Sequence, residues 1–230
     1  MRDLSQWTPR KLPQRQVVEG RYVRLEPLSA SAHGQGLFDA SATSDGDARF
    51  RWLGEGAPTT LSAFQPWLER VEASTDPLWF TVVDKETGKI AGRQTFMRTD
   101  IANGVTEIGN ILWNAPVARR PAATEALYLF ARHAFDDLGY RRFEWKCNNR
   151  NGPSKAAALR FGFTFEGVFR QHMIIKGENR DTAWFSMLDS EWPLIGSAFE
   201  AWLDPANFDA SGAQRRRLED VREGLRGRKA

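Results

Sequence analysis

The stretch from Leu78 to Leu188 constrains the fold most strongly, because its hydrophobic pattern alternates between the period of a strand and that of a helix. It begins with three segments rich in β-branched and aromatic residues, joined by the turn sequences KETG and DIANG. These segments predict an antiparallel meander, which a helix, a strand, a second helix and two further strands follow. The predicted strands cover 78–84, 88–98, 105–113, 141–147, 164–176 and 181–189, and the two helices cover 121–138 and 151–160.

The remaining sequence completes a mixed α/β domain. A further strand is expected at 20–29, where apolar and charged residues alternate, and helices are expected at 30–43 and 60–74. The fold class is therefore α/β, in the sense of an α+β mixed sheet, with about seven mostly antiparallel strands flanked by helices. The expected organisation is an N-terminal extension (1–19), one domain (20–190) and a C-terminal helical extension (191–230) whose polar end projects into solvent.

The composition excludes several classes of protein. The only cysteine, Cys147, rules out an internal disulfide and a multi-cysteine metal site, and the three histidines have no ligand spacing. The sequence contains no run of eighteen apolar residues, and its first residues lack the apolar stretch of a signal peptide. We therefore expect a soluble cytoplasmic protein without a metal ion or a membrane partner.

The net charge of +3 is distributed unevenly. From Arg215 onward there are seven Lys or Arg residues and three Asp or Glu residues, so this tail carries +4 and the preceding 214 residues carry −1. The main body has no basic excess to follow a phosphate backbone, which disfavours nucleic acid as a partner.

The start of the helix expected at 121 has the composition of an anion site. Pro121 opens the helix, two alanines follow it and two arginines precede it. A helix N-terminus presents unpaired N–H groups and the positive end of the macrodipole, and small side chains let an anion reach them. The alternative is an ordinary helix start with two solvated arginines. The candidate anion-binding residues are Arg119, Arg120, Ala122, Ala123 and Thr124.

The motifs TEIGNILW, ATEAL and NGPSKAAALRFGF, in this order, resemble those of the GNAT superfamily of acetyltransferases, particularly its ribosomal-protein N-terminal acetyltransferase branch. The resemblance implies a GNAT-like fold and acetyl-CoA as co-substrate, with the pyrophosphate held by the loop before the helix. It also implies that the strand ending at Leu112 and Trp113 splays from its neighbour to admit the pantetheine arm. The loop departs from the family pattern at two positions, with Ala118 in place of Gln or Arg and Pro121 in place of the central glycine.

The same resemblance assigns roles to two residues of the next helix. It implies that Asn151 touches the pantetheine or phosphate arm and that the hydroxyl of Ser154 faces the CoA sulfur. Many relatives carry a tyrosine four residues before the terminal glycine, as the acid for the departing thiolate; that position is Ala158 here, so the role passes to Ser154. The alternative is that Asn151 caps a helix and Ser154 lies in its first turn.

Transfer of an acetyl group to an amine also needs a group that removes a proton. The resemblance places a carboxylate base, acting directly or through water, at Glu107, with His172 and Glu166 as reserves. The alternative for Glu107 is a strand carboxylate that pairs with a neighbour. The acidic residues Asp45, Asp47 and Glu55 could attract a cationic amine, or could simply be solvated.

The expected function is acetyl-CoA-dependent N-acetyl transfer to a primary amine, of a small molecule or a protein N-terminus, by direct attack. Two alternatives remain: a non-catalytic acyl-CoA-binding module, and a ribosome- or nucleic-acid-associated protein that uses the basic tail. A homodimer is compatible with the sequence.

Overall fold

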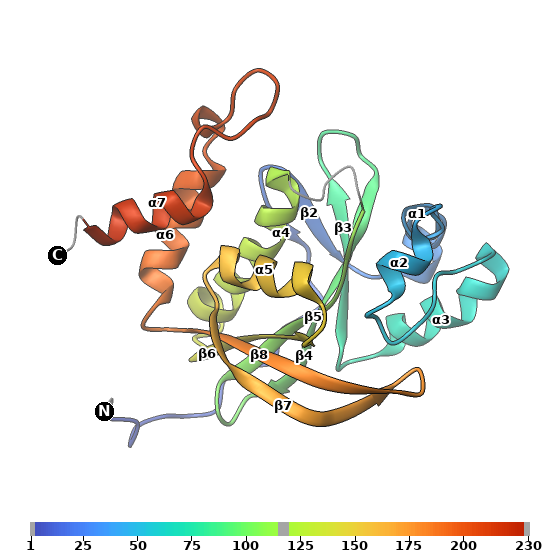
Figure 1. Cartoon of the computed structure of the whole chain (residues 1–230), viewed down its shortest axis with the longest axis horizontal. Helices are drawn as coiled ribbons and strands as arrows, with labels where there is room; N and C mark the ends of the chain where they lie inside the picture. The colour runs from blue at the N-terminus through green and yellow to red at the C-terminus, as the bar shows by residue number, and fades with distance from the viewer. Residues whose placement is uncertain (1–2, 115–119, 228–230) are drawn as a thin grey trace.

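Eight strands form one sheet in the order β1-β2-β3-β4-β5-β6-β8-β7 in the computed structural model, which describes residues 3–114 and 120–227 (Figure 1). All neighbouring strands are antiparallel except β5 and β6, which are parallel. The predicted mixed, mostly antiparallel sheet is confirmed. The strands are β1 (Val18–Glu19), β2 (Val23–Pro27), β3 (Leu78–Asp84), β4 (Ile90–Asp100), β5 (Val105–Trp113), β6 (Arg142–Asn148), β7 (Thr164–Ile175) and β8 (Glu178–Leu188).

The expected number of about seven strands was one too low. The additional strand is β1, whose two residues pair with β2. Two residues are too few to show a strand period, so the sequence carried no signal for it.

Helices cover both faces of the sheet, as β3 demonstrates. The ring centroid of its Phe80 lies 5.2 Å from that of Phe130 in α4 (Pro121–Arg132), and the ring centroid of the adjacent Trp79 lies 5.2 Å from that of Trp67 in α3 (Leu61–Ala73). Because successive strand side chains point to opposite faces, α3 and α4 lie on opposite sides (Figure 1). The helices are α1 (Ala30–Ser41), α2 (Gly46–Phe50), α3 (Leu61–Ala73), α4 (Pro121–Arg132), the π-helix η1 (His133–Asp137), α5 (Gly152–Phe161), α6 (Trp192–Leu203), the 3₁₀-helix η2 (Pro205–Asn207) and α7 (Leu218–Gly227).

The buried side chains form two separate hydrophobic clusters. The larger cluster joins the sheet to α4, α5, α6 and α7. The smaller cluster lies under α1 and α3 on the opposite face. It contains Leu28, Ala30, Leu37, Phe64, Leu68, Val71 and Trp79.

The C-terminal extension packs against the domain, so the expectation that its polar end projects into solvent was wrong. Leu218 and Val221 of α7 are buried in the larger cluster, and Arg222 Nη1 donates to the carbonyl of Arg160 in α5 at 3.0 Å. The many charged residues of α7 made its narrow apolar stripe hard to recognise in the sequence. This stripe packs against α6 and α5.

The N-terminal segment lies along the domain. The indole N–H of Trp7 donates to the carbonyl of Ala102 at 2.7 Å, and the backbone N–H of Arg10 donates to Ile101 at 3.0 Å. The hydroxyl of Tyr140 donates to the carbonyl of Lys11 at 2.9 Å. These contacts attach the segment to the β4–β5 turn and to the start of β6.

A buried carboxylate joins the helix of the ATEAL motif to the start of the sheet. Glu125 of α4 is 5% exposed and accepts three backbone N–H groups, from Arg21 at 2.8 Å, Tyr22 at 2.6 Å and Val23 at 2.8 Å. Gly20 makes this approach possible, because a Cβ there would lie 2.5 Å from Glu125 Oε2.

Replacing Glu125 with alanine is expected to lower the free energy of unfolding by about 3 kcal/mol, because it leaves backbone donors unpaired in a buried site. Urea denaturation followed by tryptophan fluorescence measures this loss. Glu19→Ala is the control, since Glu19 is exposed and its removal should change stability by no more than about 0.5 kcal/mol. An equal loss in both variants would contradict the structural role of Glu125.

Candidate active site

The two parallel strands diverge halfway along their length. Pairing between β5 and β6 runs from Val105 opposite Arg142 to Ile108 opposite Trp145 and ends there, although both strands continue. At this point the register of β5 against β4 shifts, and Asn110 has a left-handed φ of 50°. The bulge turns the end of β5 away from β6, so the expected splay is present.

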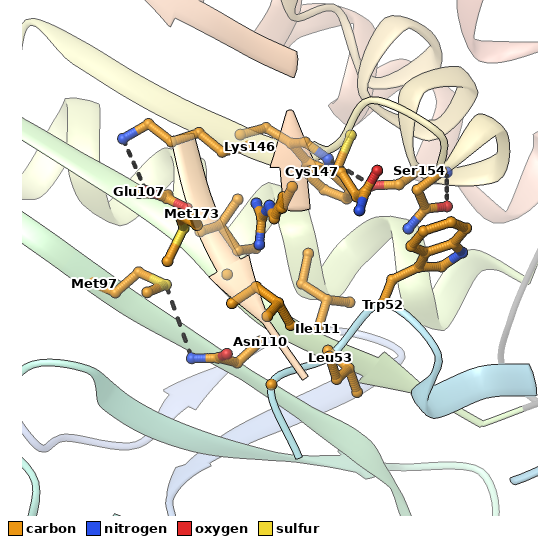
Figure 2. A pocket seen from close by; sticks show the side chains of 18 of the residues that line it. Trp52, Leu53, Met97, Glu107, Asn110, Ile111, Lys146, Cys147, Ser154 and Met173 are labelled. Atoms are coloured by element: carbon orange, nitrogen blue, oxygen red, sulfur yellow. Dashed lines mark hydrogen bonds and ion pairs between the residues drawn. The ribbon is translucent and has the colours of Figure 1, made fainter. Parts of the chain in front are cut away.

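A pocket of about 250 Å³ occupies the opening between the strands. Figure 2 shows that Asn110 and Ile111 line it from β5, Lys146 and Cys147 from β6, and Ser154 from α5. Apolar side chains from distant segments also line it: Trp52 and Leu53 after α2, Met97 of β4, and Met173 of β7 (Figure 2).

Glu107 lines this pocket and is 3% exposed. Arg98 Nη1 donates to its two carboxylate oxygens at 3.0 and 2.9 Å, and Lys146 Nζ lies 3.0 Å from Oε2. Lys146 also pairs with Glu144 at 2.6 Å. Glu107 therefore lines the pocket and is also a paired strand carboxylate, which was the alternative considered from the sequence. Neither reserve base, His172 or Glu166, lines the pocket.

Ser154 lies on the opposite wall, in the first turn of α5. Its hydroxyl accepts the indole N–H of Trp145 at 3.0 Å, and its backbone N–H donates to the Asn151 side chain at 3.1 Å. Asn151 thus caps α5 while also lining the pocket. Burial raises the pKa of the Cys147 thiol, and a hydrogen bond with the Ser154 hydroxyl lowers it in part. Ala158 is fully buried in the larger cluster and does not line the pocket.

The start of α4 presents backbone N–H groups. Arg120 is the N-cap residue, it is exposed, and its side chain does not cap the helix. Ala122 and Ala123 are 7% and 4% exposed. The side chain of Thr124 is already engaged, because its hydroxyl accepts from Arg160 Nη1 at 3.1 Å. Arg119 lies outside the described residues.

The end of β5 is held in place by three contacts. Trp113 donates its indole N–H to Gln94 Oε1 at 3.1 Å, and its ring meets Phe161 of α5 edge-on at 6.2 Å. Arg49 Nη2 donates to the Trp113 carbonyl at 3.2 Å. Leu112 is buried, with 6% exposed, and neither Leu112 nor Trp113 lines the pocket.

A buried arginine holds the segment that carries Trp52 and Leu53. Arg93 of β4 is 1% exposed, its Nη2 pairs with Glu55, and its guanidinium lies 4.4 Å from the ring centroid of Trp67 and 5.1 Å from that of Trp79. Because both tryptophans pack with α3, this wall of the pocket is attached to the smaller cluster.

The charged or aromatic residues of the pocket that sequence reasoning missed include Trp52, Arg98, Lys146 and Arg180. Lys146 had a usable signal, because it shares a strand face with Glu144, which stands opposite Glu107 in the register. The others lie in a loop or on strands whose approach to Glu107 depends on the whole sheet.

Other kinds of site receive no support in the described part of the chain. No helix within residues 3–114 and 120–227 is long and apolar enough to cross a bilayer. The same residues contain no group of three or more His, Cys, Asp or Glu side chains arranged to hold a metal ion.

A sheet that opens between two parallel neighbours, beside the N-terminus of an uncapped helix, is the architecture of a CoA-dependent acyltransferase. The family described as "Acetyltransferase (GNAT) domain" matches residues 23–164, and the chain belongs to this family of acyltransferases. The family uses acetyl-CoA.

The structure of a GCN5-related N-acetyltransferase from Brucella melitensis is 59% identical, with a TM-score of 0.95 and coverage of 96% of this chain and 100% of that chain. A protein of Chromobacterium violaceum assigned to the GNAT family is 38% identical, with a TM-score of 0.77 and coverage of 84% and 96%. The N-acetyltransferase p20 of Bacillus licheniformis is 31% identical over 117 residues, which make up 49% of this chain and 63% of that relative. The ribosomal-protein branch stays a prediction.

Proposed function

We propose that this protein transfers the acetyl group of acetyl-CoA to the amine of a second substrate by direct attack. The observation that carries the proposal is the opening between β5 and β6, which brings Glu107 and Ser154 to two walls of one pocket. An amine and a thioester placed there would lie between a carboxylate and a hydroxyl.

The residues present fit acetyl-CoA. The unpaired edges of β5 and β6 offer backbone groups to an extended amide-containing arm, and the first-turn N–H groups of Ala122, Ala123 and Thr124 suit phosphate oxygens. Pro121 has no N–H group, so it provides no hydrogen bond here. Arg120 supplies a positive charge at the same helix end. The thioester supplies an activated acetyl carbon.

Ser154 stabilises the leaving thiolate. When the amine nitrogen forms its bond to the acetyl carbon, the C–S bond breaks and negative charge develops on sulfur. Trp145 occupies one acceptor site of the Ser154 oxygen, and the hydrogen bond that the hydroxyl makes with Cys147 would pass to the CoA sulfur. A serine hydroxyl is a weak acid, so its contribution is a hydrogen bond to the developing charge.

Glu107 receives the amine proton through an ordered water. Its oxygens already accept contacts from Arg98 and Lys146, which favours relay through water over direct abstraction. These two cations also disfavour a charged ammonium ion in the pocket, so they lower the pKa of a bound amine and favour its nucleophilic form.

A screen of small amines and peptide N-termini with acetyl-CoA tests the proposal. We expect at least one amine to release free CoA thiol together with an acetylated product of matching mass. Binding of acetyl-CoA without thiol release across the screen would favour the non-catalytic module, and absence of acetyl-CoA binding would contradict the proposal.

A further inference from the structure

The pocket has an excess of positive charge. Four cationic side chains line it, and Glu107 is the only carboxylate among its described lining residues. Arg49 is occupied by the carbonyls of Ala40 and Trp113, and Arg98 and Lys146 pair with Glu107. The fourth cation, Arg180, differs from the others in the contacts of its guanidinium group.

Arg180 of β8 is fixed in place, but its guanidinium end has no partner. Its Nε donates to the hydroxyl of Thr182 at 3.1 Å, and the same hydroxyl is 2.9 Å from Nδ1 of His172. Because Thr182 is fully buried, its hydroxyl fixes the position of the Arg180 Nε atom. Among residues 3–114 and 120–227, no carboxylate lies within 4.0 Å of Arg180 and neither of its Nη atoms donates a hydrogen bond.

Arg180 lies at the junction of two pockets. Arg180 lines the pocket that contains Glu107 and Ser154, and it also lines an adjoining pocket whose charged lining residues are the cations Arg51 and Lys176 and the carboxylates Asp47 and Glu178. Burial lowers the pKa of the guanidinium, and the charge of Glu107 opposes this effect only in part. Burying an arginine without a counter-ion lowers the stability of the fold, and a bound anion would offset this loss. The planar guanidinium can donate two parallel hydrogen bonds to carboxylate or phosphate oxygens.

We infer that the acceptor amine carries an anionic group, a carboxylate or a phosphate, that binds the free Nη atoms of Arg180. This inference rests on the proposed function and names the class of its second substrate. The apolar walls formed by Trp52, Leu53 and Met173 would contact the carbon skeleton that joins the anion to the amine. The acidic residue nearest in sequence to this wall, Glu55, pairs with Arg93 and is not available to attract a cation.

Matched acceptor pairs test the inference. Each pair contains an anionic amine and its neutral counterpart, such as an amino acid and its amide, or phosphoethanolamine and ethanolamine. We expect kcat/KM to be at least about tenfold higher for the anionic member, as one charge-assisted contact provides. The two kinds of pair distinguish a carboxylate from a phosphate.

Arg180→Gln should remove this preference. We expect about a 10- to 50-fold loss in kcat/KM for the anionic acceptor and less than about a twofold change for the neutral one. Arg170→Gln is the control, because it removes the same charge from an exposed position of β7. Calorimetric titration of the anionic amine into protein saturated with CoA gives a readout that does not need turnover.

The outcomes separate the two proposals. A preference for neutral amines, an equal loss for both members in Arg180→Gln, or no calorimetric difference between Arg180→Gln and wild type would overturn the inference and leave acetyl transfer intact. Absence of both acetyl-CoA binding and thiol release would overturn the proposed function itself.

Discussion

Replacing Ser154 with alanine is expected to lower kcat by roughly ten- to a thousandfold, the range for removing one transition-state donor. The KM for acetyl-CoA should change little, because the hydroxyl acts on charge that develops only as the C–S bond breaks. Steady-state kinetics with a saturating amine measures both quantities. A serine that only positioned the co-substrate would instead raise KM.

Trp145→Phe is the matched control for Ser154→Ala. It keeps the serine but removes the indole N–H that orients the hydroxyl, so a smaller decrease in kcat is expected. Both variants should melt cooperatively near the wild-type temperature. Full kcat in Ser154→Ala would reduce Ser154 to a residue of the first turn of α5 and leave the thiolate to be protonated by solvent.

Reversing the charge of Arg120 is expected to weaken CoA binding by about 10- to 100-fold, because Arg120→Glu replaces an attraction to the pyrophosphate with a repulsion at the helix N-terminus. Arg120 is a better test position than Ala123, which is 4% exposed and would have to bury a larger side chain. Calorimetric titration with CoA measures the change in Kd.

Acetyl-pantetheine, which lacks the pyrophosphate, shows whether the effect is local. Its kcat/KM should be nearly equal in Arg120→Glu and wild type. Arg70→Glu makes the same charge change at an exposed position of α3 and should leave the Kd for CoA within about twofold. Unchanged CoA affinity in a folded Arg120→Glu protein would contradict the assignment of the phosphate site to α4.

The sequence predicted the elements whose signals are local. The strand at 78–84 coincides with β3, and the expected 105–113 with β5, because both are runs rich in β-branched and aromatic residues next to clear turn sequences. The helix after Pro121 is buried on more than one face, since residues Ala122 to Ala131 are all buried. One side of α4 packs on the sheet and the other on α6, and a helix pattern alone does not reveal a second covering layer.

The acceptor side of the pocket was not predictable in the same way. Trp52, Met97 and Arg180 come from distant parts of the chain, and only the assembled sheet and the β7–β8 hairpin bring them together. Glu107 was identified through a resemblance, but its two cationic partners depend on register. The acetyl acceptor and the homodimer likewise stay predictions.

The two hydrophobic clusters support different ends of the pocket, so the acceptor end can change while the donor end stays constrained. The wall at Trp52 is attached through Glu55 and Arg93 to the smaller cluster, whereas β5, β6 and the start of α4 rest on the larger one. Substitutions among the residues of the smaller cluster can therefore reshape the acceptor end while the donor end keeps its packing. Within a lineage of such proteins, selection can alter the choice of amine without rebuilding the machinery that binds the acetyl donor.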